Sequence, residues 1–378
     1  MKILYSCLSK SWGGMEMVTL TGIKQLLKNN IKVELLCTDE SRLQLEANNL
    51  GIIIHSIKSG KIPNPFSILK VITILKSGRF DAIHSHASKD LWLIVPALKI
   101  HKDKTPLVFT KHVGSYIIKK DFLHNIIYKR ITAAIAISSV IKRNLIKTTS
   151  IDQKKVQIIF NGVDLTKFNP NNTDKNKLRN ELKISDDEIL IGMTGRFSPG
   201  KGHEELLLAA SLLNKKYSNL KFVVVGEASR GEDEYAKSIK QLADNYNLNN
   251  LYFVGYRSDI PDVLCAMDIF VFPSHAEAFG LGLIEAMAME KATVCSNSDG
   301  VLDIAVDNET SYLFTVKDGN DLAEKLEQLI LDLEKRSSFG YNARKRVADL
   351  FDLEKVTEQV INVYSKLLKE KNDSYTKR

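Results

Sequence analysis

The stretch Ser274–Glu290 reads SHAEAFGLGLIEAMAME and decides the predicted fold. It contains two carboxylates, Glu277 and Glu285, eight positions apart, with a glycine-rich turn between them and an apolar helical run after the turn. This pattern predicts a loop that opens onto a helix, where glycines let the backbone approach a ligand and free N–H groups bind a phosphate or a sugar edge. Because eight positions exceed the spacing of a capping box, we do not expect both glutamates to be helix caps. A buried strand, turn and helix with two solvated acids would give the same pattern, so both interpretations stay open here.

The length and composition predict a globular protein with two domains. The chain has 378 residues, more than one hydrophobic core normally organises, and 44% of them are hydrophobic and 26% charged. Its four cysteines, Cys7, Cys37, Cys265 and Cys295, lie far apart without metal-binding spacing, which is typical of reduced core residues in a reducing cytoplasm. We find neither a signal peptide nor an apolar run of about 18 residues, and therefore expect a cytoplasmic protein without a transmembrane span.

The net charge of +8 is distributed unevenly along the chain. Residues 1–165 hold 25 Lys plus Arg against 11 Asp plus Glu, a balance of +14, whereas residues 166–378 hold 28 against 34, a balance of −6. A basic half can bind nucleic acid, an anionic membrane surface or a phosphorylated acceptor. The sequence lacks a nucleic-acid recognition motif, so we expect no nucleic acid partner and favour an anionic membrane surface or a lipid-linked acceptor. A merely solvated basic face remains the alternative.

Short apolar runs alternate with helical periodicity along nearly the whole chain, which is the pattern of βαβ units in parallel sheets. We predict two doubly wound domains, residues 1–165 and 188–353, joined by a polar linker at 166–187. A helix at about 354–371 is expected to pack back on the first domain, and a helix at Asp321–Lys335 to precede it. The predicted strands are Lys2–Leu8, Lys32–Cys37, Ile52–Ile57, Ala82–Ser85, Leu107–Lys111, Ala134–Ser138 and Val156–Phe160 in the first domain, and five in the second, Ile189–Thr194, Phe222–Val225, Leu251–Val254, Ile269–Phe272 and Thr293–Ser296.

Glycines and histidines follow strand ends in the first domain, where ligands bind in open α/β sheets. The pair Gly13-Gly14 follows the first strand, and His86 and His112 follow two later strands. A plain turn would also explain the glycine pair, and a lone histidine in such a loop is more often structural than catalytic.

The segment Ser115–Thr132 interleaves bulky apolar residues with lysine and arginine, which favours an amphipathic patch at a membrane interface. A surface helix that packs on its own domain gives the same pattern.

In the second domain, residues 195–203 read GRFSPGKGH between a strand and a helix. Three glycines, Arg196 and Lys201 at a helix start suit a diphosphate, because backbone N–H groups and two cations share its charge. The loop is not a P-loop, since no Gly-Lys-Ser/Thr follows at the required spacing.

Taken together, these motifs resemble glycosyltransferase family 4, a family of retaining enzymes with the GT-B fold, in which two Rossmann-like domains face each other across a central cleft. The motifs that carry the resemblance come in the family's order, namely Gly13-Gly14, Asn161-Gly162-Val163-Asp164, Gly195-Arg196 with Lys201-Gly202, and Glu277 and Glu285 around Phe279-Gly280.

The resemblance implies a role for each site residue. Arg196 and Lys201 would bind the donor diphosphate without a metal or other cofactor, and Glu285 would hold the ribose hydroxyls. Glu277 would lie by the transferred sugar, as a ligand and stabiliser in our preferred interpretation and as a nucleophile in the alternative. His112 matches a family histidine near the donor sugar, and Gly14 a loop that closes on the diphosphate. The remaining donor-binding candidates are Gly13, Gly195, Gly226, Tyr256, Ala278, Phe279, Gly280 and Leu281.

Two segments depart from the family pattern. Residues 226–232 are less regular than usual, which affects the expected contacts to the base, and Val301-Leu302 before Asp303 replaces a Gly-Pro-like turn beside the sugar pocket.

The predicted function is a retaining, metal-independent transfer of a sugar from a nucleotide-diphosphate sugar to a saccharide or lipid-linked acceptor. Cell-surface polysaccharide or lipopolysaccharide synthesis is the expected context, with the protein peripheral on the inner face of the cytoplasmic membrane. A GT-B epimerase or phosphorylase and a non-catalytic nucleotide-sugar binding protein are the alternatives.

Overall fold

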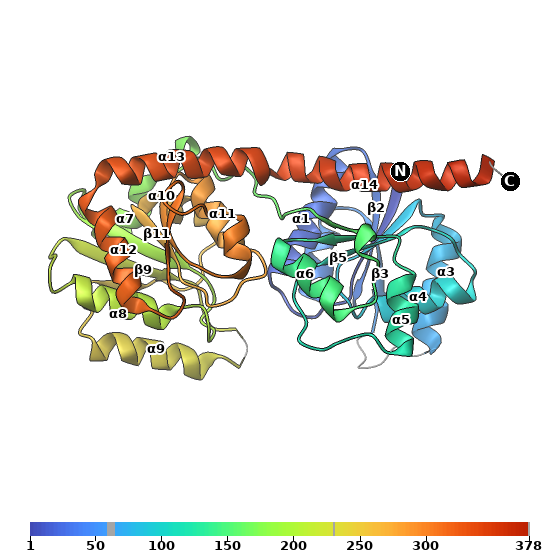
Figure 1. The fold of residues 1–378 in the computed structure, drawn as a ribbon, viewed down its shortest axis with the longest axis horizontal. Helices are drawn as coiled ribbons and strands as arrows, with labels where there is room; N and C mark the ends of the chain where they lie inside the picture. Colours follow the sequence, from blue (N-terminus) through green and yellow to red (C-terminus); the bar gives the residue numbers. More distant parts are fainter. Residues whose placement is uncertain (59–64, 230, 377–378) are drawn as a thin grey trace. The chain divides into compact units, whose positions relative to one another are not determined.

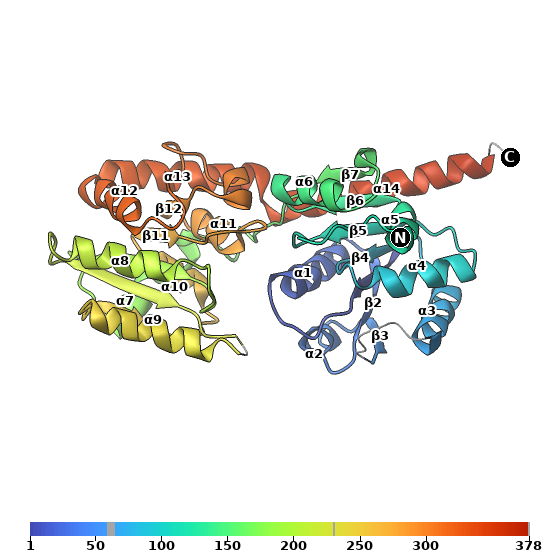
Figure 2. The same cartoon turned by 60° about the horizontal axis from the view of Figure 1, so that its bottom comes forward.

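The chain is organised as two compact units, each with its own parallel sheet. The computed structural model describes residues 1–58, 65–229 and 231–376. The first unit comprises Met1–Asn161 and Glu354–Arg378, and the second comprises Gly162–Leu353. Figure 1 and Figure 2 show each sheet with its helices. The prediction of a two-sheet α/β fold is confirmed.

The sheet of the first unit has seven strands in the described residues, in the order β3-β2-β1-β4-β5-β6-β7. All its pairs are parallel, and β1 lies between β2 and β4. The residues of β1 are almost fully buried, because both faces of a parallel sheet are covered by helices. The strands are β1 Lys2–Cys7, β2 Lys32–Thr38, β3 Ile53–Ile57, β4 Ala82–Ser85, β5 Leu107–Lys111, β6 Ala133–Ala136 and β7 Val156–Ile158.

The helices of the first unit include the last helix of the chain, α14. Ile23 of α1 and Val363 of α14 share one buried apolar cluster with Ile3 and Leu35 of the sheet. The helices α3, α4 and α5 lie side by side (Figure 1). Their bounds are α1 Gly14–Lys28, α2 Arg42–Asn48, α3 Pro65–Gly78, α4 Leu91–Ile100, α5 Phe122–Lys129, α6 Ser139–Thr148, η1 Gln153–Lys155 and α14 Leu353–Thr376.

The second unit has a six-stranded parallel sheet in the described residues, in the order β10-β9-β8-β11-β12-β13. The prediction of five strands was wrong, because Ser311–Phe314 forms β13 beside β12. This strand has only four residues, of which three are apolar or aromatic, so its apolar run is too short for a clear strand signal. The strands are β8 Ile189–Thr194, β9 Leu220–Val225, β10 Leu251–Phe253, β11 Ile269–Phe272, β12 Ala292–Ser296 and β13 Ser311–Phe314.

A helix break in the second unit also differs from the prediction. The single helix expected at Asp321–Lys335 is two helices, since α12 ends at Leu331 and α13 begins at Leu333. Asp332 separates them in an extended conformation, and its side chain accepts a hydrogen bond from the Lys335 N–H at 2.7 Å. The helices are α7 Lys175–Glu181, α8 His203–Leu213, α9 Asp233–Asn245, α10 Ile260–Ala266, α11 Leu281–Ala288, α12 Gly319–Leu331 and α13 Leu333–Leu350, with η2 Pro170–Asn172 and η3 Asp299–Asp303.

Part of the segment 166–187 is ordered on the second unit. The helix α7 packs against α10, and its Arg179 is 2% exposed. The Arg179 guanidinium donates hydrogen bonds to the carbonyls of Ala266, Ser185 and Glu188. Among the described residues, no helix has the length and apolar character needed to cross a bilayer.

Candidate functional site

The strand order of the second unit places its candidate residues at one edge of the sheet. The chain winds outward from β8 to β10 and then returns to β11 on the other side of β8. The loops after β8 and β11 therefore meet at the point where the winding reverses, which is where open α/β sheets bind ligands. Arg196 and Lys201 lie in the first loop, and Glu277 lies in the second.

Glycines allow the loops after β8 and β9 to touch. The backbone of Gly226 has φ +143°, and a Cβ atom there would lie 1.8 Å from the carbonyl oxygen of Gly195. The Gly195 N–H donates to the Val225 carbonyl at 2.9 Å, which fixes the turn after β8. These contacts leave the Arg196 side chain exposed, where its guanidinium donates to Ser229 Oγ at 2.9 Å. The Arg196 guanidinium therefore lies beside two closely packed backbone segments, one with Gly195 and the other with Gly226 at the contact.

A second glycine contact joins the loop after β8 to the end of β11. Gly202, the N-cap of α8, has φ +81°, and a Cβ atom there would lie 2.2 Å from the Pro273 carbonyl oxygen. The His275 N–H donates to the Gly200 carbonyl at 2.9 Å. As a result, the Lys201 ammonium group donates a hydrogen bond to Oε1 of Glu277. The structure thus brings together two residues that the sequence assigned separately to the diphosphate and the sugar.

The turn between the two glutamates forms the start of α11. Gly280, its N-cap, has φ +127°, and Leu281 is its first residue. The Phe279 side chain is buried and lies edge-on to Phe351, with ring centroids 5.7 Å apart. Phe279 can therefore face a ligand only through its backbone, as the resemblance implies for this residue. The prediction of a loop opening onto a helix is confirmed.

Glu285 lies on α11 with its carboxylate half-buried. No hydrogen bond or ion pair joins this carboxylate to another residue in the described ranges. Burial raises the pKa of Glu285 to about 7, with a smaller opposing effect from the charge of Lys167. A partly desolvated carboxylate without a partner is a strong acceptor for hydroxyl groups.

Tyr256 follows Gly255 at the end of β10, and its side chain is 64% exposed. The Gly255 backbone, at φ +68°, makes the turn that presents it. In the irregular segment 226–232, Ser198 Oγ donates to the Glu232 carboxylate, which ties the segment to the loop after β8. Arg230 of this segment lies outside the described residues.

The candidates of the first unit lie at the ends of β1 and β5. The Glu16 carboxylate accepts a hydrogen bond from the Gly13 N–H at 2.9 Å, which caps α1 where Gly14 begins it. His112 is 5% exposed, and its Nε2 lies 3.0 Å from Nδ1 of His86. Burial lowers the pKa of His112 to about 3 and that of His86 well below its ordinary value. Both imidazoles are therefore neutral near pH 7 and act as hydrogen-bonding groups.

Two buried polar residues beside these histidines were not among the predicted site residues. Asp90 accepts hydrogen bonds from Ser6 Oγ at 3.0 Å and from the Leu8 N–H at 3.1 Å, and burial raises its pKa to about 7. His84 bonds through its two ring nitrogens to Tyr364 and Thr110. In the sequence, Asp90 follows Lys89 and looks like one half of a solvated pair, so no local pattern could identify it.

Exposed apolar side chains gather in the segment 116–123. We call Tyr116, Ile117, Ile118, Lys119, Lys120, Phe122 and Leu123 the apolar-basic surface. Its aromatic and aliphatic members are exposed, with 70% for Ile117 and 76% for Phe122. Asn144 of α6 holds the loop by bonding both the N–H and the carbonyl of Ser115. The predicted amphipathic segment is therefore a fixed loop followed by α5, and only Phe122–Lys129 is helical.

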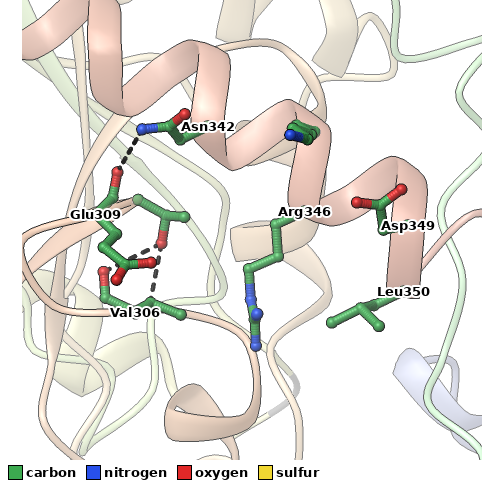
Figure 3. A pocket seen from close by; sticks show the side chains of 8 residues that line it. Val306, Glu309, Asn342, Arg346, Asp349 and Leu350 are labelled. Atoms are coloured by element: carbon green, nitrogen blue, oxygen red, sulfur yellow. Dashed lines mark hydrogen bonds between the residues drawn. The ribbon is translucent and has the colours of Figure 1, made fainter.

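A surface pocket of about 450 Å³ lies between α13 and the turn before β13 (Figure 3). Arg346 lines it with Glu309, Asn342 and Asp349. None of its lining residues is one of the predicted site residues.

Comparison with known proteins gives matches over both units. The family model described as Glycosyltransferase Family 4 matches residues 12–167, and the one described as Glycosyl transferases group 1 matches residues 174–346. The chain is 28% identical over 365 residues to the capsular polysaccharide biosynthesis glycosyltransferase CapM of Staphylococcus aureus, covering 92% of this chain and 93% of the relative.

A second relative and a solved structure cover similar lengths. The chain is 27% identical over 350 residues to the N,N'-diacetylbacillosaminyl-diphospho-undecaprenol alpha-1,3-N-acetylgalactosaminyltransferase of Campylobacter jejuni, covering 88% of this chain and 90% of the relative. The crystal structure of a glycosyltransferase from Rickettsia africae ESF-5 has a TM-score of 0.90 and 25% identity, covering 97% of this chain and 98% of that one.

Proposed function

This chain belongs to the group 1 glycosyltransferases of family 4, and we propose that it moves a sugar from a nucleoside-diphosphate sugar to a lipid-linked saccharide. The transfer retains the anomeric configuration, and the product is part of a cell-surface polysaccharide or lipopolysaccharide. The observation that carries the proposal is the half-buried, unpartnered carboxylate of Glu285 at the point where the sheet reverses. The relative named for capsular polysaccharide and the one named for a diphospho-undecaprenol substrate support the choice of acceptor.

In this proposal the donor lies along the loops after β8 and β11. The hydroxyls of the ribose donate to the Glu285 carboxylate, which has no competing partner among the described residues. Arg196 and Lys201 stabilise the negative charge that gathers on the leaving diphosphate, so the reaction proceeds without a divalent ion. Gly195 and Gly226 let the backbone approach the phosphates, and exposed Tyr256 stacks on the base.

Glu277 and His112 act on the transferred sugar. The negative charge of Glu277 stabilises the positive charge that develops on the sugar as its bond to the phosphate breaks. His112 hydrogen-bonds a sugar hydroxyl as a neutral imidazole, because burial holds its pKa near 3. The acceptor hydroxyl gives its proton to the leaving phosphate, and the two groups lie on the same face of the sugar.

We further propose that the first unit works at an anionic bilayer, which is where a lipid-linked acceptor is found. Residues 99–130 hold eight Lys plus Arg, two Asp and no Glu, so their charge is complementary to acidic lipid headgroups. The apolar-basic surface adds exposed aromatic and aliphatic side chains on a loop that Asn144 fixes. This combination is typical of proteins that lie on a membrane interface.

The test is a donor screen followed by a transfer assay. Thermal shift with a panel of UDP- and GDP-sugars identifies the donor, because a ligand at about 100 times its Kd adds about 2.7 kcal/mol of stability. The selected donor is then incubated with an undecaprenyl-diphosphate-linked sugar, with and without EDTA. We expect a glycosylated lipid product in both samples. An epimerised nucleotide sugar, or donor binding without transfer to any such acceptor, would overturn the proposal.

A further inference from the structure

Arg346 of α13 bonds two backbone carbonyls of the second unit. Its side chain points away from the helix beside the pocket (Figure 3). Its Nε donates to the Ile304 carbonyl at 2.6 Å, and its Nη2 donates to the Asp303 carbonyl at 3.0 Å. These carbonyls end the short helix η3, where the helix leaves acceptors without a partner of its own.

The other end of η3 rests on the loop that carries Glu277. The Gly300 N–H donates to the Glu277 carbonyl at 3.0 Å. A Cβ atom on Gly300 would lie 2.6 Å from the Ala278 carbonyl oxygen, so the two backbones are in direct contact. A displacement of η3 would therefore move the backbone of Glu277 and Ala278 with it.

The conformation of η3 needs support from outside the helix. Asp299, its first residue, has φ +42°, in the left-handed region that residues with a side chain rarely adopt. Such a conformation persists only where the surrounding contacts hold it. Val301 is fully buried below it, and the Arg346 guanidinium holds its far end.

We propose that Arg346 is a positioning residue for the transferred sugar. It fixes η3, η3 fixes the backbone of Glu277 through Gly300, and this backbone aims the Glu277 carboxylate beside Lys201. Arg346 does not touch the substrate, and its role rests on the proposed function of Glu277. Because the ribose and the diphosphate are assigned to other residues, its loss should affect the rate of transfer more than the affinity for the nucleotide.

The same helix provides a matched control in Arg336. Its Nη1 donates to the carbonyls of Leu329 at 2.6 Å and Ile330 at 3.0 Å, at the end of α12. Arg336 and Arg346 therefore make the same kind of contact from α13 to the end of a preceding helix. Of the two helix ends that these arginines hold, only η3, held by Arg346, touches the loop of Glu277. A comparison of the two arginine variants therefore separates an effect on the position of Glu277 from an effect on stability alone.

The experiment compares Arg346→Met, Arg346→Lys and Arg336→Met with the wild-type chain. We expect similar losses of thermal stability in the two methionine variants. Arg346→Met should lower kcat about 10-fold, with UDP or GDP affinity unchanged, and Arg346→Lys should recover part of the rate. Arg336→Met should keep the wild-type kcat. Equal kcat in the two methionine variants, or a rate loss explained by nucleotide affinity, would overturn the proposal.

Hydrogen exchange gives a readout that does not require turnover. In Arg346→Met, the amides of Gly300 and of residues 277–280 should exchange several-fold faster, and in Arg336→Met they should not. Unchanged exchange at these amides in Arg346→Met would overturn the positioning role even in an active enzyme. A wild-type chain without transfer activity, combined with the expected exchange, would instead overturn the proposed function and leave the structural link established.

Discussion

Lys201 donates a hydrogen bond to the Glu277 carboxylate across 76 positions of sequence, and this ion pair joins the loop after β8 to the loop after β11. Both side chains are largely buried, with 28% of Lys201 and 16% of Glu277 exposed. The pair therefore places one positive and one negative charge at the reversal of the sheet, which suits the proposed reaction, since it separates a cationic sugar from an anionic phosphate.

Removing the charge of Glu277 and removing the charge of Lys201 should affect different kinetic constants. Glu277→Gln keeps the size of the side chain and one acceptor oxygen but removes the charge that stabilises the developing sugar cation. We expect kcat to fall about 100-fold with little change in donor KM. Lys201→Ala removes a cation from the diphosphate and should mainly raise donor KM. Initial rates over a range of donor concentrations measure both.

The double variant Lys201→Ala with Glu277→Gln supplies the control for this pair. Because the two side chains touch, the two effects on kcat/KM should be coupled by about 1 kcal/mol or more. Strictly additive losses would contradict a shared role.

Glu285→Gln should stabilise the protein while it weakens donor binding. Burial raises the folded pKa of Glu285 from 4.5 to about 7, so between these pH values the folded chain binds more protons than the unfolded chain. Stability therefore falls as pH rises through this window, and the whole cost is present above pH 7. Glutamine cannot ionise, so the variant should be more stable at pH 8 by about 1–3 kcal/mol, with the difference vanishing near pH 4.

The measurements are thermal unfolding at pH 8 and pH 5, and donor affinity at pH 8. Affinity should fall at least about 10-fold, since the amide accepts the ribose hydroxyls less strongly. Glu324→Gln, at an exposed position of α12, should change neither quantity. A destabilised Glu285→Gln at pH 8 would assign the carboxylate a structural role.

The glycines Gly226 and Gly195 should respond differently to alanine. A Cβ atom on Gly226 would lie 1.8 Å from the Gly195 carbonyl oxygen, whereas one on Gly195 has no heavy atom within 4 Å. Gly226→Ala should therefore lower both thermal stability and donor affinity. Gly195→Ala should keep the stability within about 0.5 kcal/mol and lower only donor affinity, because the methyl group meets the phosphates. Wild-type donor affinity in Gly195→Ala would remove this residue from the site.

The features of the fold and the site that could be predicted from the sequence are those whose pattern lies within one short stretch of the chain. The loops after β8 and β11 could be located because each apolar strand is followed by a turn-forming residue, Gly195 after β8 and Pro273 after β11, which is a local pattern. The strand β13 was missed because it has only four residues and directly follows the polar segment 307–310, so its apolar run is short. The contacts between Lys201 and Glu277, and those that hold Asp90 or Arg346, join residues far apart in the chain, so no local pattern contains them.

The apolar-basic surface should bind anionic vesicles through both of its components. Replacing Ile117 and Phe122 with serine removes the side chains that enter the interface, and replacing Lys119 and Lys120 removes the attraction to acidic lipid. Each pair of changes should reduce co-sedimentation several-fold. Binding of the wild-type chain should weaken as the salt concentration rises, because salt screens the attraction between charges farther apart than the Debye length, which is about 8 Å at physiological ionic strength.

Two controls accompany the vesicle experiment. Leu331→Ser removes an exposed apolar side chain from the second unit and should leave binding unchanged. Equal binding of the wild-type chain to neutral and anionic vesicles would contradict the electrostatic component.

The hydroxyl of Tyr364 on α14 bonds to His84 in the core of the first unit and lies 3.3 Å from the hydroxyl of Tyr5. During synthesis, residues 1–161 leave the ribosome long before this tyrosine. Until α14 arrives, the apolar side chains of the first unit that pack against Val363 and Tyr364 stay exposed to water, which costs free energy. The unit whose synthesis begins first is thus the last to be completed, because residues 162–353 are made before α14.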